Sequence, residues 1–164
     1  CGTRYAIDLN PDTVQFADPG VTVYQATSDN MHMISDGALD VVFCSNFFEH
    51  LPSTGMLLDT LAEVRRVLSD GGKLLIIQPN IKYAFREYWD FVDHHLPLSH
   101  LTVVEALASA RFEIDVVVPR FLPYTTKSRL PQTPHLLRLY IAFPLLWRAA
   151  GKQMFVAAHK PSSM

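Results

Sequence analysis

The sequence predicts an α/β fold in which a mostly parallel sheet has helices on both faces and an antiparallel last strand. Two observations predict this fold class. First, residues 39–43 and 74–77 are short runs, apolar apart from Asp40, of the length typical of strands buried inside a parallel sheet. Second, apolar residues recur at helical spacing between these runs, and strands that alternate with helices indicate a parallel sheet with crossover helices.

Length and composition predict one domain over residues 1–164, since 164 residues with 49% hydrophobic and 18% charged side chains suffice for a sizeable core. The net charge of −2 gives no reason to expect nucleic acid or an acidic membrane as the main partner. Cys1 and Cys44 are too few for a disulfide framework, so a reducing cytoplasm is expected. No apolar run reaches the ~18 residues of a membrane-spanning helix.

The first segment is a strand over residues 4–8 that ends in a carboxylate, Asp8. A short helix and a second strand at residues 21–24 follow. An acidic residue at a strand tip of a nucleotide-binding α/β fold commonly holds both ribose hydroxyls, so we expect Asp8 to bind a ribose. The alternative is that Asp8 only forms a turn or caps a helix. In the polar linker after this strand, Ser28 and Asp29 are expected to reach an adenine, or else are ordinary loop residues.

Polarity changes abruptly where the strand at residues 39–43 ends. The polar residues that follow are Ser45, Asn46, Glu49 and His50. Because ligands of open α/β sheets bind beyond the carboxyl ends of the strands, we expect a binding site here. The alternative is that Ser45 or Asn46 only caps a helix. This strand is expected inside the sheet, paired directly with the strand at residues 4–8; the alternative is a gap in the sheet between these two strands.

The next helix carries its apolar residues at spacings of four, three and four. They are Leu57, Leu61, Val64 and Leu68. Gly71 and Gly72 are expected to end this helix, because glycine takes the left-handed conformation at low cost. Residues 73–80 then form another apolar strand with a polar end, and a later helix and a strand at residues 113–119 continue the alternation.

Two segments fall outside this regular pattern. Residues 81–100 interleave aromatic side chains with His94, His95 and His100, which predicts a flap over a pocket; the alternative is a surface loop packed by its own aromatics. Residues 120–151 form an excursion that ends in an apolar helix interrupted by Pro144. The last strand follows at residues 153–159.

The order of these motifs resembles the class I S-adenosylmethionine-dependent methyltransferases, in the group of the type 11 and ubiquinone-biosynthesis domains. The D-G-A-L-D-V-V of residues 36–42 is similar to the family's D-G-S-F-D-V-V, and the F-E-H-L of residues 48–51 to its l-E-H-l. Residues 61–74 resemble its R-V-L-k-P-G-G-x-L passage. Residues 6–8 resemble the second strand of the family, whose acidic tip binds ribose. The likeness covers most of residues 4–118 and the last strand.

The resemblance implies a Rossmann-like fold with S-adenosylmethionine as the cofactor. The residues that it and the strand-tip argument assign to cofactor binding are Gly2, Asp8, Leu9, Asn10, Ser28, Asp29, Ser45 and Asn46. The family's first strand and glycine-rich loop are absent, with Cys1-Gly2 as a remnant of the loop. We therefore expect a longer native chain, a fragment, or a non-catalytic relative.

Catalysis of methyl transfer needs an aligned acceptor and exclusion of water, and an oxygen acceptor also needs a base. Histidine has a suitable pKa. His50 is the first candidate for the catalytic residue, followed by His94 and His95. Asn46, Glu49 and His50 share one face of a helix, and some relatives bind magnesium at a Glu-x-x-Glu-His pattern. Here Asn46 replaces the first glutamate, and histidine suits magnesium poorly, so no metal is predicted.

The expected activity is O- or N-methylation of a small, amphiphilic acceptor, with no nucleic-acid partner because the basic residues are scattered. The segment at residues 120–151 is expected to be an acceptor-side lid. Its apolar helix lines the acceptor pocket, forms a homodimer interface, rests on a membrane surface, or packs inside its own domain. Two other function classes remain: a non-catalytic methyltransferase-like scaffold and a nicotinamide-dependent oxidoreductase, whose ribose an acidic strand tip would also bind.

Overall fold

The structure is a computed structural model that describes residues 2–124 and 133–162. Its elements, in chain order, are β1 (Arg4–Ile7), α1 (Thr13–Phe16), β2 (Val21–Tyr24), β3 (Leu39–Ser45), the 3₁₀ helix η1 (Phe48–His50), α2 (Thr54–Val67), β4 (Leu68–Pro79), α3 (Ile81–Tyr88), α4 (His100–Ser109), β5 (Glu113–Val118), α5 (Pro134–Ala142), α6 (Pro144–Ala150) and β6 (Gln153–His159).

Four strands form the main sheet in the order β3-β4-β6-β5, and β1 and β2 form a separate parallel pair. β3 and β4 are parallel, with Phe43 opposite Leu75. β6 is antiparallel to both β4 and β5. The predicted α/β fold with an antiparallel last strand is therefore confirmed.

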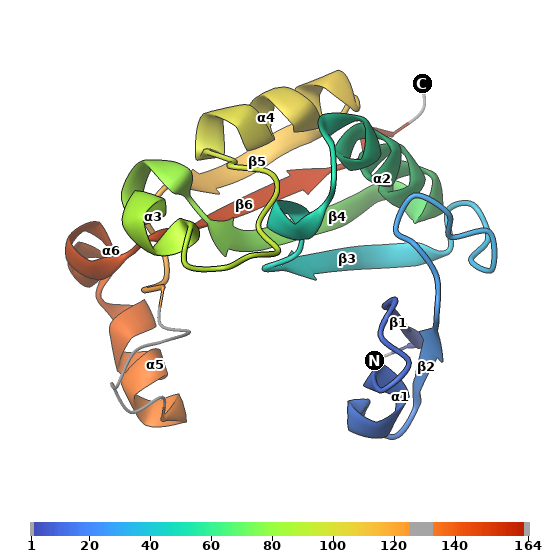
Figure 1. Cartoon of the computed structure of the whole chain (residues 1–164). Coiled ribbons are helices and arrows are strands. Elements are labelled where there is room, and N and C mark those ends of the chain that lie inside the picture. The colour runs from blue at the N-terminus through green and yellow to red at the C-terminus, as the bar shows by residue number, and fades with distance from the viewer. Residues whose placement is uncertain (1, 125–132, 163–164) are drawn as a thin grey trace.

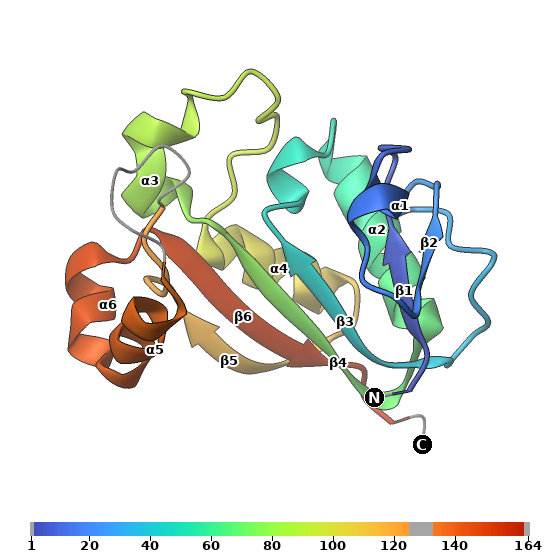
Figure 2. The ribbon, with the colours of Figure 1, turned by 90° about the horizontal axis from the view of Figure 1, so that it is seen from below.

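The predicted position of β3 is wrong. We expected residues 39–43 inside the sheet and paired with the first strand, but β3 is an edge strand of the described sheet, and β1 pairs only with β2. Figures 1 and 2 show the β1–β2 pair standing apart from β3. Val41 and Phe43 are consequently 53% and 59% exposed. An apolar run predicts a strand, but it does not specify which strands lie beside it.

One face of the main sheet is covered by α2 and α4, as Figure 1 shows. The predicted apolar face of α2 is confirmed, because Leu57, Leu61 and Val64 are buried in the same core as Leu74 and Ile76 of β4. Capping by side chains fixes where both helices begin: Ser53 caps α2, and Ser99 and Thr102 form a capping box on α4. α1 and α5 lie on the side of the opposite face, near its two ends (Figure 1).

The segment at residues 81–100 is more regular than predicted. Its first part is the helix α3, capped by Asn80, and only residues 89–99 form an irregular flap. Residues 125–132 of the predicted lid lie outside the described residues. The rest of it carries α5 and α6, whose break before Pro144 agrees with the sequence. Across residues 2–124 and 133–162, every helix is too short or too polar to span a bilayer.

Candidate functional site

Side-chain hydrogen bonds link the carboxyl end of β4 to that of β5, and the carboxyl end of β3 to the start of β6. Asn80, directly after β4, donates from its Nδ2 to the carbonyl of Pro119 after β5 at 2.9 Å, and the same atom lies 2.9 Å from Nδ1 of His100. Asn46, after β3, accepts a hydrogen bond from Nε2 of Gln153 at 2.8 Å. The polar residues predicted at these strand ends therefore lie along one edge of the sheet.

A cluster of Glu49, His50 and His94, in which Glu49 and His94 are buried and His50 is half-buried, lies at this edge. Asn46 takes a left-handed conformation with φ 47°, which turns the chain from β3 into η1. The amides of His95 and Leu96 then donate to the carbonyl of Glu49 at 2.8 and 3.1 Å, which holds the flap against η1. As a result, one ligand atom from each of the three cluster residues lies within 4.8 Å of the other two.

Two polar atoms of the cluster are buried without a hydrogen-bond partner among the described residues. They are Oε2 of Glu49 and Nδ1 of His94. Residue Glu49 is only 1% exposed and residue His94 is 7% exposed. Burial raises the pKa of the Glu49 carboxyl to about 7. Burial, and then the neighbouring His50, lower the pKa of His94. Burial therefore favours the neutral form of the His94 imidazole.

His50 is oriented by Asp93. Its Nδ1 lies 3.1 Å from Oδ2 of Asp93 and 3.2 Å from the Asp93 carbonyl oxygen. The rings of His50 and His94 meet edge to face, with centroids 5.0 Å apart. Tyr88 packs on the other side of His94 at 4.6 Å between centroids. Two of the three histidines predicted as catalytic thus come together from separate segments of the chain.

His95 and Asn46 are placed differently from their neighbours. His95 is exposed and contributes its backbone amide, not its ring, to the cluster. The predicted helical face shared by Asn46, Glu49 and His50 is wrong, because Asn46 lies outside η1 and its side chain is bound to Gln153. The sequence analysis did not single out Asp93. Its position directly before the histidine pair was the signal that could have identified it.

The residues predicted to bind the cofactor lie at several places. Asp8, directly after β1, is exposed, and its Oδ1 accepts a hydrogen bond from the amide of Asn10 at 2.9 Å, a local contact that fixes the turn after the strand. The hydroxyl of Ser28 lies 2.7 Å from that of Thr60, so it is engaged with α2. The other predicted residues are exposed: Gly2, Leu9, Asn10, Asp29, Ser45 and Asn46.

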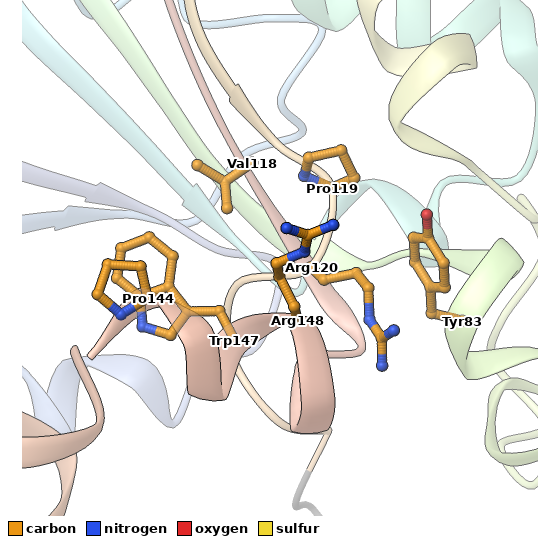
Figure 3. A pocket seen from close by; sticks show the side chains of 7 residues that line it. All are labelled: Tyr83, Val118, Pro119, Arg120, Pro144, Trp147 and Arg148. Atoms are coloured by element: carbon orange, nitrogen blue, oxygen red, sulfur yellow. The ribbon is translucent and has the colours of Figure 1, made fainter. Parts of the chain in front are cut away.

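A pocket of about 470 Å³ lies beyond the end of β5 (Figure 3). Its lining residues come from α3, α6 and the end of β5: Tyr83, Val118, Pro119, Arg120, Pro144, Trp147 and Arg148. Arg120 lies over the ring of Tyr83 at 4.9 Å and donates to the carbonyls of Ala149 and Gly151, both at 3.0 Å. The pocket therefore combines two guanidinium groups with apolar walls. Sequence reasoning did not identify either arginine.

Polar residues at the strand ends of an α/β sheet are typical of domains that bind a nucleotide-type ligand at this edge of the sheet. Comparison with protein families is more specific. Residues 1–76 match the family described as "Methyltransferase domain". No curated protein sequence matches the chain at a significant level.

Solved structures of methyltransferases share the fold. A SAM-dependent methyltransferase from Archaeoglobus fulgidus superposes with a TM-score of 0.71 at 19% identity, over 95% of this chain and 75% of that one. A SAM-dependent methyltransferase from Methanosarcina mazei superposes with a TM-score of 0.65 at 16% identity, over 97% of this chain and 82% of that one. The geranyl diphosphate C-methyltransferase of Streptomyces coelicolor superposes with a TM-score of 0.63 at 16% identity, over 97% of this chain and 64% of that one. That structure was solved with Mg²⁺, geranyl diphosphate and S-adenosyl-L-homocysteine.

Residues 1–76, a little under half of the chain, thus match the methyltransferase family, and the fold is shared with solved S-adenosylmethionine-dependent methyltransferases, which the sequence motifs resemble.

Proposed function

We propose that this chain methylates an oxygen or nitrogen atom of an amphiphilic small molecule that carries an anionic group. The observation that carries the proposal is the pocket beyond β5. It places Arg120 and Arg148, which suit a phosphate or carboxylate, beside the apolar surfaces of Pro144 and Trp147. Such a pocket matches a molecule with a charged head and a hydrocarbon part.

The neighbouring elements support an apolar part in the acceptor. Most apolar side chains of α5 and α6 are exposed, including Leu139, Phe143 and Leu145. Trp147 ties the two helices together, because its Nε1 donates to the carbonyl of Tyr140 at 3.0 Å. The Streptomyces coelicolor neighbour, whose bound geranyl diphosphate is an amphiphilic anion, is consistent with this acceptor class.

The roles of the site residues follow from their chemistry. When bound, S-adenosylmethionine supplies an activated methyl group. We infer that Asp8 holds its ribose and that the Glu49–His50–His94 cluster receives the reacting atom of the acceptor. His94 is suited to take the proton of a hydroxyl acceptor, because burial favours its neutral form and its Nδ1 has no other partner among the described residues. We place the reaction in the cytoplasm, in keeping with the two cysteines.

Two measurements test the proposal. Calorimetry should show binding of S-adenosylhomocysteine and no binding of NAD; the reverse result would favour the oxidoreductase, and no binding of either would favour a non-catalytic scaffold. Transfer of a labelled methyl group should then be compared among prenyl phosphates, fatty acids and neutral lipids. Arg148→Gln should reduce turnover of the anionic compounds at least tenfold. Arg138→Gln is the matched control, since Arg138 is exposed on α5 and does not line the pocket. Equal turnover of charged and neutral compounds would contradict the anionic acceptor.

A further inference from the structure

We propose that Glu49, His50 and His94 bind a divalent transition-metal ion such as Zn²⁺. The three residues come from η1 and the flap, and they offer one carboxylate and two imidazoles within 4.8 Å of one another. No other group of three histidine, cysteine or acidic side chains with this geometry occurs among residues 2–124 and 133–162.

The unsatisfied atoms of the cluster point to an ion. Oε2 of Glu49 and Nδ1 of His94 are both buried, and neither has a hydrogen-bond partner in the described chain. A buried carboxylate or imidazole nitrogen without a partner is unfavourable, and proteins keep such groups mainly where a charge or a ligand satisfies them. One cation between Glu49 and His94 satisfies both atoms and compensates the buried carboxylate.

The surroundings of His50 are those of a metal ligand. Histidine ligands commonly donate their second ring nitrogen to a carboxylate or a carbonyl, which fixes the ring and increases its basicity. Asp93 supplies both kinds of acceptor to Nδ1 of His50, at 3.1 and 3.2 Å. Nε2 of His50 is then the nitrogen that binds the ion.

The donor set determines which ion fits. Two imidazoles and one carboxylate favour zinc, cobalt or iron over magnesium, which prefers oxygen ligands. Ligand atoms around tetrahedral zinc lie about 3.4 Å apart, given bonds of about 2.1 Å. The widest pair, at up to 4.8 Å, would therefore have to close by side-chain rotation when the ion binds.

Three protein ligands leave at least one coordination position open. We assign it to the acceptor, whose oxygen would be positioned by the ion while His50 and His94 serve as ligands. In the metal-bound chain Nδ1 of His94 would therefore not serve as the base, and the ion itself would favour loss of the acceptor's proton. This role rests on the proposed methyl transfer, but the binding of the ion does not.

The test uses the full, tag-free chain after removal of metal by a chelator. Equilibrium dialysis against micromolar Zn²⁺, with the metal measured by mass spectrometry, should give one ion per chain. The visible bands of bound Co²⁺ should report a site with nitrogen ligands. Glu49→Gln and His94→Gln should each weaken binding at least tenfold. His95→Gln is the matched control, because His95 is the exposed neighbour of His94 and should bind the ion as the unmodified chain does.

Circular dichroism should accompany each variant. If the buried substitutions prevent folding, Asp93→Asn keeps the proposal testable, because this exposed residue orients His50 without being a ligand, and its loss should weaken binding about 10- to 100-fold. An unmodified chain that retains no ion, or a folded His94→Gln variant that binds as tightly as His95→Gln, would refute the metal site. These outcomes are independent of the assays for S-adenosylhomocysteine binding and methyl transfer, so either proposal can fail alone.

Discussion

The imidazole rings of His50 and His94 lie edge to face at 5.0 Å, although α2, β4 and α3 separate them in the chain. Backbone hydrogen bonds hold the two segments together, because the amides of His95 and Leu96 both donate to the carbonyl of Glu49. The cluster is therefore shaped by main-chain geometry before any ligand arrives. A preformed site of this kind requires less reorganisation at the moment of binding or reaction.

Asp8→Asn is expected to weaken binding of S-adenosylhomocysteine at least tenfold, because each charge-assisted hydrogen bond to a ribose contributes about 1.5–3 kcal/mol. Calorimetric titration measures the effect. Asp12→Asn serves as the control, since Asp12 is an exposed carboxylate in the same segment. Unchanged affinity in the Asp8 variant would show that this residue only supports the turn at Asn10.

Arg66→Ala is expected to lower the free energy of unfolding by about 2 kcal/mol. Arg66 donates to the carbonyls of Met31 and Ile34, both at 2.9 Å, and these residues are buried. Removal of the guanidinium leaves both acceptors unsatisfied, at about 1–3 kcal/mol for such groups. Urea unfolding measures the loss, and Arg65→Ala, which removes only one long bond to Arg111, should cost clearly less.

The contribution of Arg66 should also depend on pH. Its hydrogen bond to Glu63 holds the pKa of that carboxyl below its usual range. Because the folded pKa is lower than the unfolded value of about 4.3, the resulting stability is present above that pH and is lost as the pH falls through the folded pKa. The difference between the unmodified chain and Arg66→Ala should therefore shrink below about pH 4.3. A difference that stays constant from pH 7 to the acid range would disprove the coupling.

Local patterns explain how far the sequence predicted the fold. Most of the apolar face of α2 and the core of β4 were predicted correctly, because both depend on periodicity within one segment. The boundary between them was wrong: β4 already begins at Leu68, and Gly71 and Gly72, which were expected to end the helix, lie inside the strand. The strands that lie beside β3 were not predicted correctly, since the pairing of strands depends on the whole sheet. Helix α3 was described as part of a flap because its aromatic residues, such as Tyr83 and Tyr88, obscured the helical pattern begun by Asn80.

In the candidate site, too, local features were predicted from the sequence and contacts between distant segments were not. His50 and His94 were recognised because a polar segment after a strand and a histidine pair are local signals. His95 could not be separated from His94 by residue type, and only the burial of one ring and the exposure of the other distinguishes them. Arg120 and Arg148 meet at the pocket because α6 folds back beside the end of β5, and no motif in the sequence encodes that contact.

The thiol of Cys44 is expected to resist alkylation in the folded protein. Burial raises its pKa to about 12, so only about one thiol in ten thousand is ionised at pH 8, whereas an ordinary cysteine has a pKa of about 8.5. The rate of reaction with iodoacetamide, measured in a Cys1→Ser background, should rise sharply when urea unfolds the chain. Equal rates in the folded and unfolded protein would show that the thiol is accessible and not desolvated.

The double variant Leu139→Ser/Phe143→Ser should keep the melting temperature of the unmodified chain within a few degrees, because both side chains are more than half exposed and contribute little to the core. Methyl transfer to an acceptor with a long hydrocarbon tail should nevertheless fall, since serine removes apolar surface that we expect the tail to contact. Turnover of a short-chain acceptor with the same anionic group provides the control and should change little. If long and short acceptors are affected alike, and neither sedimentation nor binding to liposomes changes, α5 and α6 have no part in the choice of acceptor.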